Sequence, residues 1–93
     1  MYRDELEFEW DEEKAAANFR KHGIRFETAV RVFQDPNLME DYDDDHSRKE
    51  DRYKVIGKVD QILSVVYTER REHIRLITAR KATKTERRRY LDR

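Results

Sequence analysis

Basic and aromatic residues gather toward the C-terminal end of this 93-residue sequence. Two tyrosines are interleaved there with nine cations: Tyr67 and Tyr90 with Arg70, Arg71, Arg75, Arg80, Lys81, Lys84, Arg87, Arg88 and Arg89. Arginine binds phosphate oxygens through its planar fork, and aromatic rings stack on unpaired bases. The combination suits single-stranded RNA, but three consecutive arginines cover most of a helix circumference, so part of the run is a solvated face.

A second set of reactive side chains lies near the N-terminus, where Lys14, Asn18 and His22 repeat every four residues. On a helix this spacing forms one polar stripe beside the apolar positions Ala15 and Phe19. Histidine ionises near neutrality, so His22 can act as a general acid or base. A histidine at a helix end can equally serve only to face the helix dipole, and the residues alone favour this structural role.

The acidic stretch around His46 is the one place that suggests a metal site. A histidine among carboxylates can bind a hard cation, and the neighbours are Asp43, Asp44, Asp45 and Glu50. Their spacing matches no calcium or zinc motif, so we expect neither a metal nor another cofactor. The sequence also contains no nucleophile elbow and no glycine-rich phosphate loop.

Charge is divided unevenly along the chain. Residues 1–51 contain 16 acidic and 8 basic residues, whereas residues 52–93 contain 5 acidic and 13 basic ones. The basic half can meet phosphate and the acidic half a basic protein. Alternatively, the two halves simply neutralise each other in the fold.

Length and composition limit the class of protein. Ninety-three residues suffice for one small domain, which we expect to span residues 1–93. The longest apolar stretch, Ile62 to Tyr67, is far too short to cross a bilayer, and Met1 to Glu5 contain no signal-peptide core. The absence of cysteine excludes disulfides and fits a reducing compartment. We therefore expect a cytoplasmic protein that does not associate with membranes.

The elements that must position the reactive residues follow from periodicity and capping signals. Alternating apolar residues from Leu6 to Trp10 predict a short strand. Asp11 is typical of a helix N-cap, and Gly23 can adopt the left-handed conformation that ends a helix after His22. Phe26, Ala29, Val30 and Phe33 then repeat with the period of a second amphipathic helix, which ends at Asp35-Pro36.

The second half of the sequence predicts a sheet. Residues 38–42 are expected to form a strand and residues 41–51 a solvated loop. Three further strands, around 53–59, 62–68 and 74–79, are joined by short connections and predict antiparallel hairpins. The capping box from Thr83 to Glu86 opens a last helix that runs through Leu91. The order predicts an α+β domain with its helices packed on one face of an antiparallel sheet.

Three ordered blocks of residues resemble the BrnT family of toxins. The first extends from Phe8-Glu9-Trp10-Asp11 through Lys14-Ala15, Asn18 and Lys21-His22-Gly23-Ile24 to Phe26-Glu27. The second is His46-Ser47 with Glu50 and Arg52. The third is Ile74-Arg75-Leu76-Ile77-Thr78-Ala79-Arg80 with Ala82, Glu86-Arg87 and Tyr90. Together they cover nearly the whole chain. One departure is Arg25, where the family often has a small polar residue, and this weakens the expected cap of the second helix.

The resemblance implies both a fold and a function. The fold would be RelE-like, with two N-terminal helices and a C-terminal helix around the sheet. The protein would be the toxin of a type II toxin–antitoxin module, a metal-independent endoribonuclease that cleaves RNA and arrests growth. A cognate BrnA-like antitoxin with a ribbon-helix-helix domain would neutralise it in a hetero-oligomer. Operator DNA would be bound only through the antitoxin.

Metal-free RNA cleavage requires a base for the 2′-hydroxyl, cations for the charge on the phosphorane and an acid for the leaving oxygen. The resemblance and this chemistry together assign Arg80 to the phosphate, Arg75 to a second cation, and His22 or Lys14 to proton transfer. The remaining candidates would bind RNA, namely Tyr67, Arg87, Arg88 and Tyr90.

Two questions stay open in the sequence. Arg75 and Arg80 are five residues apart, so both can serve one face of a sheet only if the strand ends or bulges before Arg80. The alternative function is a non-catalytic module that binds nucleic acid or protein through the basic face, and it needs neither His22 nor Lys14. A purely structural partner protein would need none of these residues.

Overall fold

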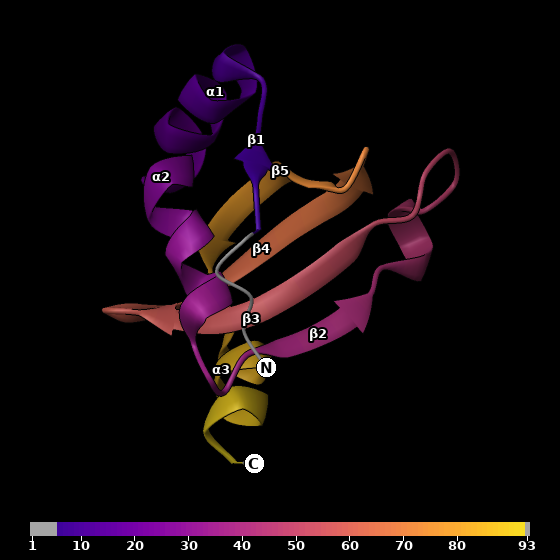
Figure 1. Cartoon of the computed structure of the whole chain (residues 1–93). Coiled ribbons are helices and arrows are strands. Elements are labelled where there is room, and N and C mark those ends of the chain that lie inside the picture. The colour runs from indigo at the N-terminus through magenta and orange to yellow at the C-terminus, as the bar shows by residue number, and fades with distance from the viewer. Residues whose placement is uncertain (1–5, 93) are drawn as a thin grey trace.

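A twisted sheet forms the centre of the chain, and helices precede and follow its long strands (Figure 1). The computed structural model describes residues 6–92, so Met1 to Glu5, the segment without a signal-peptide core, lie outside it. Within this range the strands are β1 (Phe8–Glu9), β2 (Met39–Tyr42), β3 (Tyr53–Val59), β4 (Gln61–Arg70) and β5 (His73–Lys81). The helices are α1 (Glu12–His22), α2 (Phe26–Ala29) and α3 (Lys84–Leu91), with 3-10 turns η1 (Val30–Gln34) and η2 (Asp44–His46).

Helix α1 has the bounds that its capping residues predict. The side chain of Asp11 accepts hydrogen bonds from the backbone N–H groups of Glu13 and Lys14, at 2.8 and 3.4 Å. At the other end Gly23 is left-handed, with φ of 73°, and its N–H donates to the carbonyl of Phe19. These contacts satisfy backbone groups that a helix leaves unpaired at its ends.

The second helix is shorter than its periodicity predicts. The four residues of α2 continue directly into the 3-10 turn η1, and Arg25 at the N-cap makes no side-chain capping bond. The weak cap expected at Arg25 is therefore confirmed. A close approach explains the tight packing of η1 on the sheet: a β-carbon at Gly57 would lie 3.0 Å from the Cβ of Val32.

The sheet is mixed, and the expectation of a purely antiparallel sheet is wrong. Its strand order is β1-β5-β4-β3-β2, and the last four of these strands pair antiparallel, as predicted. The two residues of β1, however, pair parallel to β5, with Phe8 opposite Ile74. The direction of this two-residue strand is set by its pairing with β5, which is distant in the sequence. A local sequence pattern cannot indicate such a pairing.

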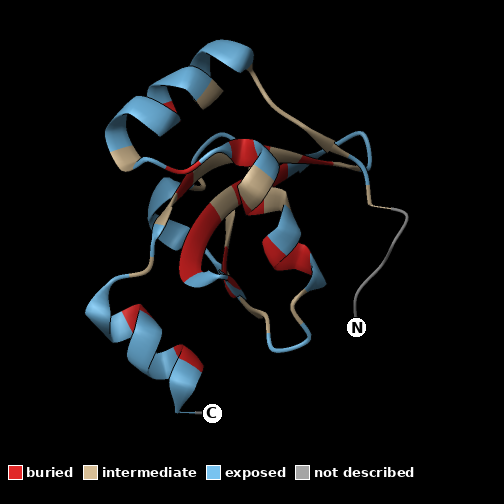
Figure 2. Cartoon of the chain, turned by 90° about the vertical axis from the view of Figure 1, so that its left-hand side faces the viewer, coloured by how far each residue is buried: buried red, intermediate tan, exposed pale blue. Residues whose placement is uncertain are grey.

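The main core lies between the sheet and the first two helices. Phe26, Val32 and Phe33 pack there against inward-facing strand residues such as Val55 and Val65. Figure 2 shows that most of the buried segments lie in the middle of the molecule. Alternation along β3 and β4 puts these residues on one face of the sheet. Burial is concentrated in this layer, as expected for a small domain in which 45% of the residues are charged.

Helix α3 lies on the opposite face, which corrects the expectation that all helices share one face. Tyr90 packs against Ile56 and Ile62, and both of these residues alternate away from the main core. The helix begins with the predicted capping box, because Thr83 and Glu86 bond reciprocally to each other's backbone N–H groups. Because α3 is short, it covers only the part of this face near Ile56 and Ile62. We call this side of the sheet the open face.

A β-bulge in β5 changes which residues reach the open face. Val66 of β4 pairs with Thr78, but the next residue, Tyr67, pairs with Leu76, so Ile77 is the extra residue. Every side chain after the bulge is shifted to the other face relative to regular alternation. The bulge therefore answers the question of whether Arg75 and Arg80 share a face.

Asn18 connects α1 to the edge of β5. Its side-chain amide donates to the carbonyl of Ala79 at 2.9 Å and accepts from the N–H of the same residue at 3.0 Å. A second donation from the amide, also at 2.9 Å, goes to the carbonyl of Ile24. The short strand β1 pairs only with the first part of β5. At Ala79 the buried side chain of Asn18 bonds the backbone N–H and C=O groups that a neighbouring strand would otherwise bond.

We expect Asn18→Ala to destabilise the fold by about 3 kcal/mol or more, because buried backbone groups would lose their partners. Urea unfolding measures the change. Arg20→Ala, at an exposed position of the same helix, is the matched control and should change stability by less than about 0.5 kcal/mol. Equal effects of the two substitutions would contradict this account of Asn18.

Candidate active site

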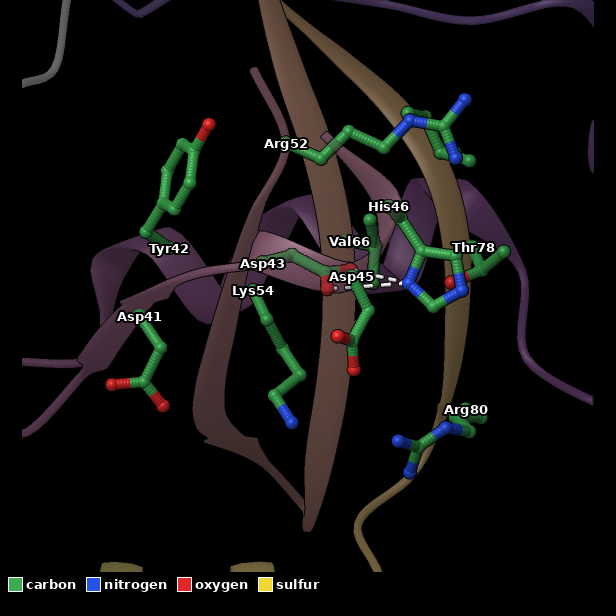
Figure 3. A pocket seen from close by; sticks show the side chains of 11 residues that line it. Asp41, Tyr42, Asp43, Asp45, His46, Arg52, Lys54, Val66, Thr78 and Arg80 are labelled. Atoms are coloured by element: carbon green, nitrogen blue, oxygen red, sulfur yellow. Dashed lines mark hydrogen bonds and ion pairs between the residues drawn. The ribbon is translucent and has the colours of Figure 1, made fainter. Parts of the chain in front are cut away.

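A cavity of about 680 Å³ lies on the open face, between the sheet and the loop that follows β2 (Figure 3). Its lining combines acidic residues of β2 and the loop with cations from β5, from β3 and from the residue before β3. The lining residues are Asp41, Tyr42, Asp43, Asp45, His46, Arg52, Lys54, Val66, Ile77, Thr78 and Arg80. We call it the first cavity. Val66 and Thr78 face each other across β4 and β5 and form its floor, and the bulge residue Ile77 lies beside them.

Two cations at one end of the first cavity share a single carboxylate. Glu86 of α3 accepts hydrogen bonds from Arg80 at 3.0 and 3.2 Å and from Lys54 at 2.9 Å. The side chains of Lys54 and Arg80 remain 29% and 33% exposed, whereas that of Glu86 is only 9% exposed. The carboxylate therefore holds both cations in place, and part of each cationic side chain remains exposed to a ligand.

The same contacts determine how Glu86 ionises. Burial alone would raise its pKa, but the hydrogen bonds from Arg80 and Lys54 and from the Thr83 backbone outweigh burial and lower the pKa to about 2. Glu86 is accordingly a carboxylate at neutral pH. Three charged groups then carry a net charge of +1, which favours the approach of a phosphate.

His46 lies at the loop side of the first cavity and contacts a carboxylate. Its Nδ1 atom is 3.0 Å from Asp43, and 67% of the imidazole side chain is exposed. A carboxylate at Nδ1 orients the ring and leaves Nε2 as the atom that can exchange a proton with a ligand. In Figure 3 the ring lies over the floor, between the carboxylates of the loop and Thr78.

The loop that carries His46 is held by side-chain hydrogen bonds. Ser47 accepts from the N–H of Arg52 at 2.9 Å and donates to the carbonyl of Asp43 at 2.6 Å. Thr68, buried on β4, donates to the carbonyl of Asp51 at 2.6 Å. The loop is therefore tied to the sheet and forms a wall of the cavity, although its composition predicts only a solvated segment.

A second, smaller cavity of about 190 Å³ adjoins the first. Its lining is mostly charged: Asp11, Lys14, Glu50, Arg52, Thr68, Arg70, Arg75, Leu76 and Ile77. Arg52 and Ile77 line both cavities. The two hollows are therefore neighbouring parts of one charged surface.

The comparison with protein families decides the family. Residues 10–86 match the family model described as "Ribonuclease toxin, BrnT, of type II toxin-antitoxin system". The chain belongs to the BrnT family. No curated protein matches it at a significant level. An antitoxin partner and an RNA substrate follow at the level of the family, and the resemblance of the three sequence blocks is confirmed.

The BrnT-family fold brings together some of the residues expected to act in catalysis and separates others. Arg75 pairs across the ladder with Thr68, and Arg80 with Ser64, so both arginines lie on the open face. Four residues along β4 separate the two positions, about 13 Å. Lys14 and Arg75 line the second cavity and Arg80 the first, while His22, at the C-terminal end of α1, lines neither.

The two tyrosines expected to bind RNA, Tyr67 and Tyr90, are both buried, which leaves little of either ring exposed for stacking on a base. Tyr67 is 4% exposed, packs between Phe33 and Tyr53, and donates its hydroxyl hydrogen to Glu40. Burial, together with the bond to Glu40, raises the pKa of Tyr67. Tyr90 is 8% exposed and likewise part of a core. The β-alternation around Tyr67 and the helical spacing of Tyr90 are consistent with burial, whereas the basic residues near both rings favour RNA binding.

Other expectations for the site remain predictions. Arg87 and Arg88 are exposed on α3, where RNA can reach them. His46, Lys54 and Arg52 were not among the expected catalytic residues, although His46 and Arg52 belong to the central block of the family resemblance. Within residues 6–92 no group of three or more potential ligands is placed to hold a metal ion. No helix in that range is long and apolar enough to cross a membrane.

We expect Glu86→Gln to lower the free energy of unfolding by about 3 kcal/mol at pH 7, because the lowered pKa of Glu86 stabilises the folded state. That stabilisation is fully present above the ordinary glutamate pKa of 4.5 and is lost as the pH falls toward 2. The difference from the wild type should therefore shrink below about pH 4.5.

Urea unfolding at several pH values between about 3.5 and 7 measures this dependence. The matched control is Glu69→Gln, at an exposed position of β4, which should show no such loss. A constant difference between Glu86→Gln and the wild type across this range would show that the ion pairs do not stabilise the fold.

Proposed function

We propose that this BrnT-family chain is an endoribonuclease that cleaves RNA without a metal ion, and that the first cavity is its active site. The observation that carries the proposal is the convergence of His46 with Lys54 and Arg80 on one open cavity. A histidine and fixed cations are the groups that transesterification of RNA requires. The family supplies the general activity, since its members are described as ribonuclease toxins.

In the proposed mechanism the scissile phosphate lies against Arg80 and Lys54. Their positive charges stabilise the phosphorane and take the part that a metal ion plays elsewhere. Nε2 of His46 removes the proton from the 2′-hydroxyl, and the leaving 5′-oxygen takes a proton from solvent water. The 2′-oxygen attacks phosphorus, the bond from phosphorus to the 5′-oxygen breaks, and a 2′,3′-cyclic phosphate results. Asp43 contacts Nδ1 and orients the ring.

The proposal extends to the fold relationship, the compartment and the partner. Two helices before the long strands and one after them support a relation to RelE-type ribonucleases. We also propose that the chain acts in the cytoplasm and is neutralised there by a BrnA-like ribbon-helix-helix antitoxin. Its acidic N-terminal half favours a division of labour in which the antitoxin supplies the contacts to operator DNA.

The purified chain should cleave single-stranded RNA in excess EDTA and leave 2′,3′-cyclic phosphate ends. Gel analysis of end-labelled RNA, with enzymatic removal of the cyclic phosphate, measures both properties. Adding the co-encoded antitoxin should abolish cleavage in proportion to the amount added. The mixture, but not this chain alone, should retard operator DNA.

Two outcomes would count against this proposal. Cleavage that EDTA abolishes and magnesium restores would replace the mechanism by a metal-dependent one. RNA binding without any cleavage, in a chain that is correctly folded, would favour the non-catalytic binding module.

The same substitution at two histidines should separate the acid–base group from the helix-end residue. His46→Gln should lower the rate of cleavage about 100-fold or more, because glutamine keeps a polar side chain but cannot carry the proton. His22→Gln should change the rate less than about threefold, since His22 lies outside both cavities. Single-turnover rates measured across pH test this. A large loss of cleavage rate in His22→Gln, with little loss in His46→Gln, would instead assign proton transfer to His22, as the sequence analysis expects.

A further inference from the structure

We infer that the second cavity is a phosphate subsite, which binds a backbone phosphate of the RNA that flanks the scissile one. This inference rests on the proposed function, because it treats the first cavity as the place of cleavage. It gives Lys14 a task in substrate binding, where the sequence suggested proton transfer.

The charge of the second cavity supports a phosphate ligand. Four cations line it, Lys14, Arg52, Arg70 and Arg75, against the two carboxylates Asp11 and Glu50. Its volume of about 190 Å³ suits a phosphate group better than a nucleoside. Arginines and a lysine around a small polar hollow are the usual protein environment of a phosphate.

The two carboxylates in this lining are already engaged. Asp11 accepts hydrogen bonds from the first N–H groups of α1, so its charge faces the positive end of the helix. Glu50 lies between Arg70, at 3.1 Å, and Arg52, at 3.7 Å. Neither acid neutralises the side chain of Lys14, whose exposed ammonium group has no hydrogen bond or ion pair with any residue from 6 to 92.

Arg52 connects the two cavities. Its side chain lines both of them, and its Nε atom is buried without a hydrogen-bond partner within the described range. In Figure 3 the side chain extends across the sheet toward β5. A buried donor without a partner costs stability unless a ligand or water satisfies it. The side chain as a whole is 31% exposed, so a polyanion that passes from one cavity to the other would meet the exposed part of the Arg52 guanidinium.

The bulge makes a continuous path geometrically possible. Because Arg75 and Arg80 lie on the same face, an RNA strand can follow β5 from the first cavity to the second without crossing the edge of the sheet. The spacing along β4, about 13 Å, is longer than one arginine side chain can bridge. Each of the two arginines is also held by its own carboxylate, Arg75 by Glu9 and Arg80 by Glu86, so they are placed to contact different phosphates.

Binding of an oligonucleotide with single neutralised phosphates tests the subsite. The probe is a short single-stranded RNA with a 2′-deoxy nucleotide at the cleavage position, so that binding is measured without cleavage. In each member of the series one phosphate is replaced by an uncharged methylphosphonate. Fluorescence anisotropy at fixed salt gives the dissociation constants for the wild type, Lys14→Gln, Arg70→Gln and Lys21→Gln.

In the wild type, neutralising one flanking phosphate should weaken binding about 10-fold, as expected for loss of a charge-assisted contact. In Lys14→Gln and in Arg70→Gln the loss at that position should fall to about threefold or less, because the partner charge is already missing. Lys21→Gln removes the same charge from the same helix outside the cavity, and it should keep the full 10-fold loss. Neutralising the scissile phosphate should weaken binding equally in all four proteins.

Three outcomes would overturn the subsite. A wild type that is insensitive at every flanking position has no second phosphate site. A 10-fold loss that persists in both Lys14→Gln and Arg70→Gln places the contact elsewhere. A defect of Lys14→Gln in cleavage of all-ribo RNA, with its sensitivity to the flanking methylphosphonate unchanged, would return Lys14 to proton transfer. Failure of the proposed function differs from all three, since it appears as absent cleavage by the wild type.

Discussion

The side chain of Asn18 is the contact on which the arrangement of this fold depends. Strand β1 pairs with β5 only at Ile74 and Arg75, so the edge of β5 beyond them would be unpaired. Asn18 bonds both backbone groups of Ala79 and so replaces the missing strand at that point. Its third bond, to Ile24, fixes the turn from which α2 begins. One amide thus fixes α1 against β5 and sets the position of Lys14, which lies one helical turn earlier, beside the second cavity.

The bulge at Ile77 and the anchor at Ala79 act on neighbouring parts of the same strand. The bulge turns Arg80 to the open face, and the hydrogen bonds of Asn18 hold the residue just before it. Glu86 then fixes the guanidinium from α3, together with the ammonium group of Lys54. Backbone register, edge pairing and an ion pair therefore all determine where one guanidinium lies. Such multiple support is typical of positions whose geometry matters for function.

Local signals in the sequence were sufficient for elements that local contacts define. The caps of α1, the weak cap at Arg25 and the capping box at Thr83 involve residues within a few positions of one another, so their patterns predicted the observed bonds. The sequence shows only that Arg75 and Arg80 can share a face if the strand bulges between them. Whether it bulges depends on the register of β4 and β5, which no local pattern gives. The sequence around His46 raises only the question of a metal site, which its spacing rejects, and nothing local shows that its loop folds back over the sheet. The charged sequence neighbours of Tyr67 favour a role in RNA binding. Its core partner Phe33 lies 34 positions away, so the sequence does not indicate their contact.

Ion pairs within the fold join the acidic and the basic halves of the sequence. The attraction of the protein for a polyanion therefore depends on where each cation is held. Carboxylates of the acidic half contact cations of the basic half, as in the pairs of Glu9 with Arg75, Glu50 with Arg70 and Asp41 with Arg89. A site made of such pairs attracts polyanions less strongly than free arginines would, so non-specific binding is weaker. In return each paired guanidinium is held in one orientation, and less conformational entropy is lost when a phosphate binds. Among the lysines and arginines that line the two cavities, Lys14 has no acidic partner for its side chain within the described range. Its positive charge is therefore the one least balanced by a neighbouring carboxylate. The charge pattern that suggested two separate partners therefore also produces a preorganised surface, on which the position of each cation matters more than their number.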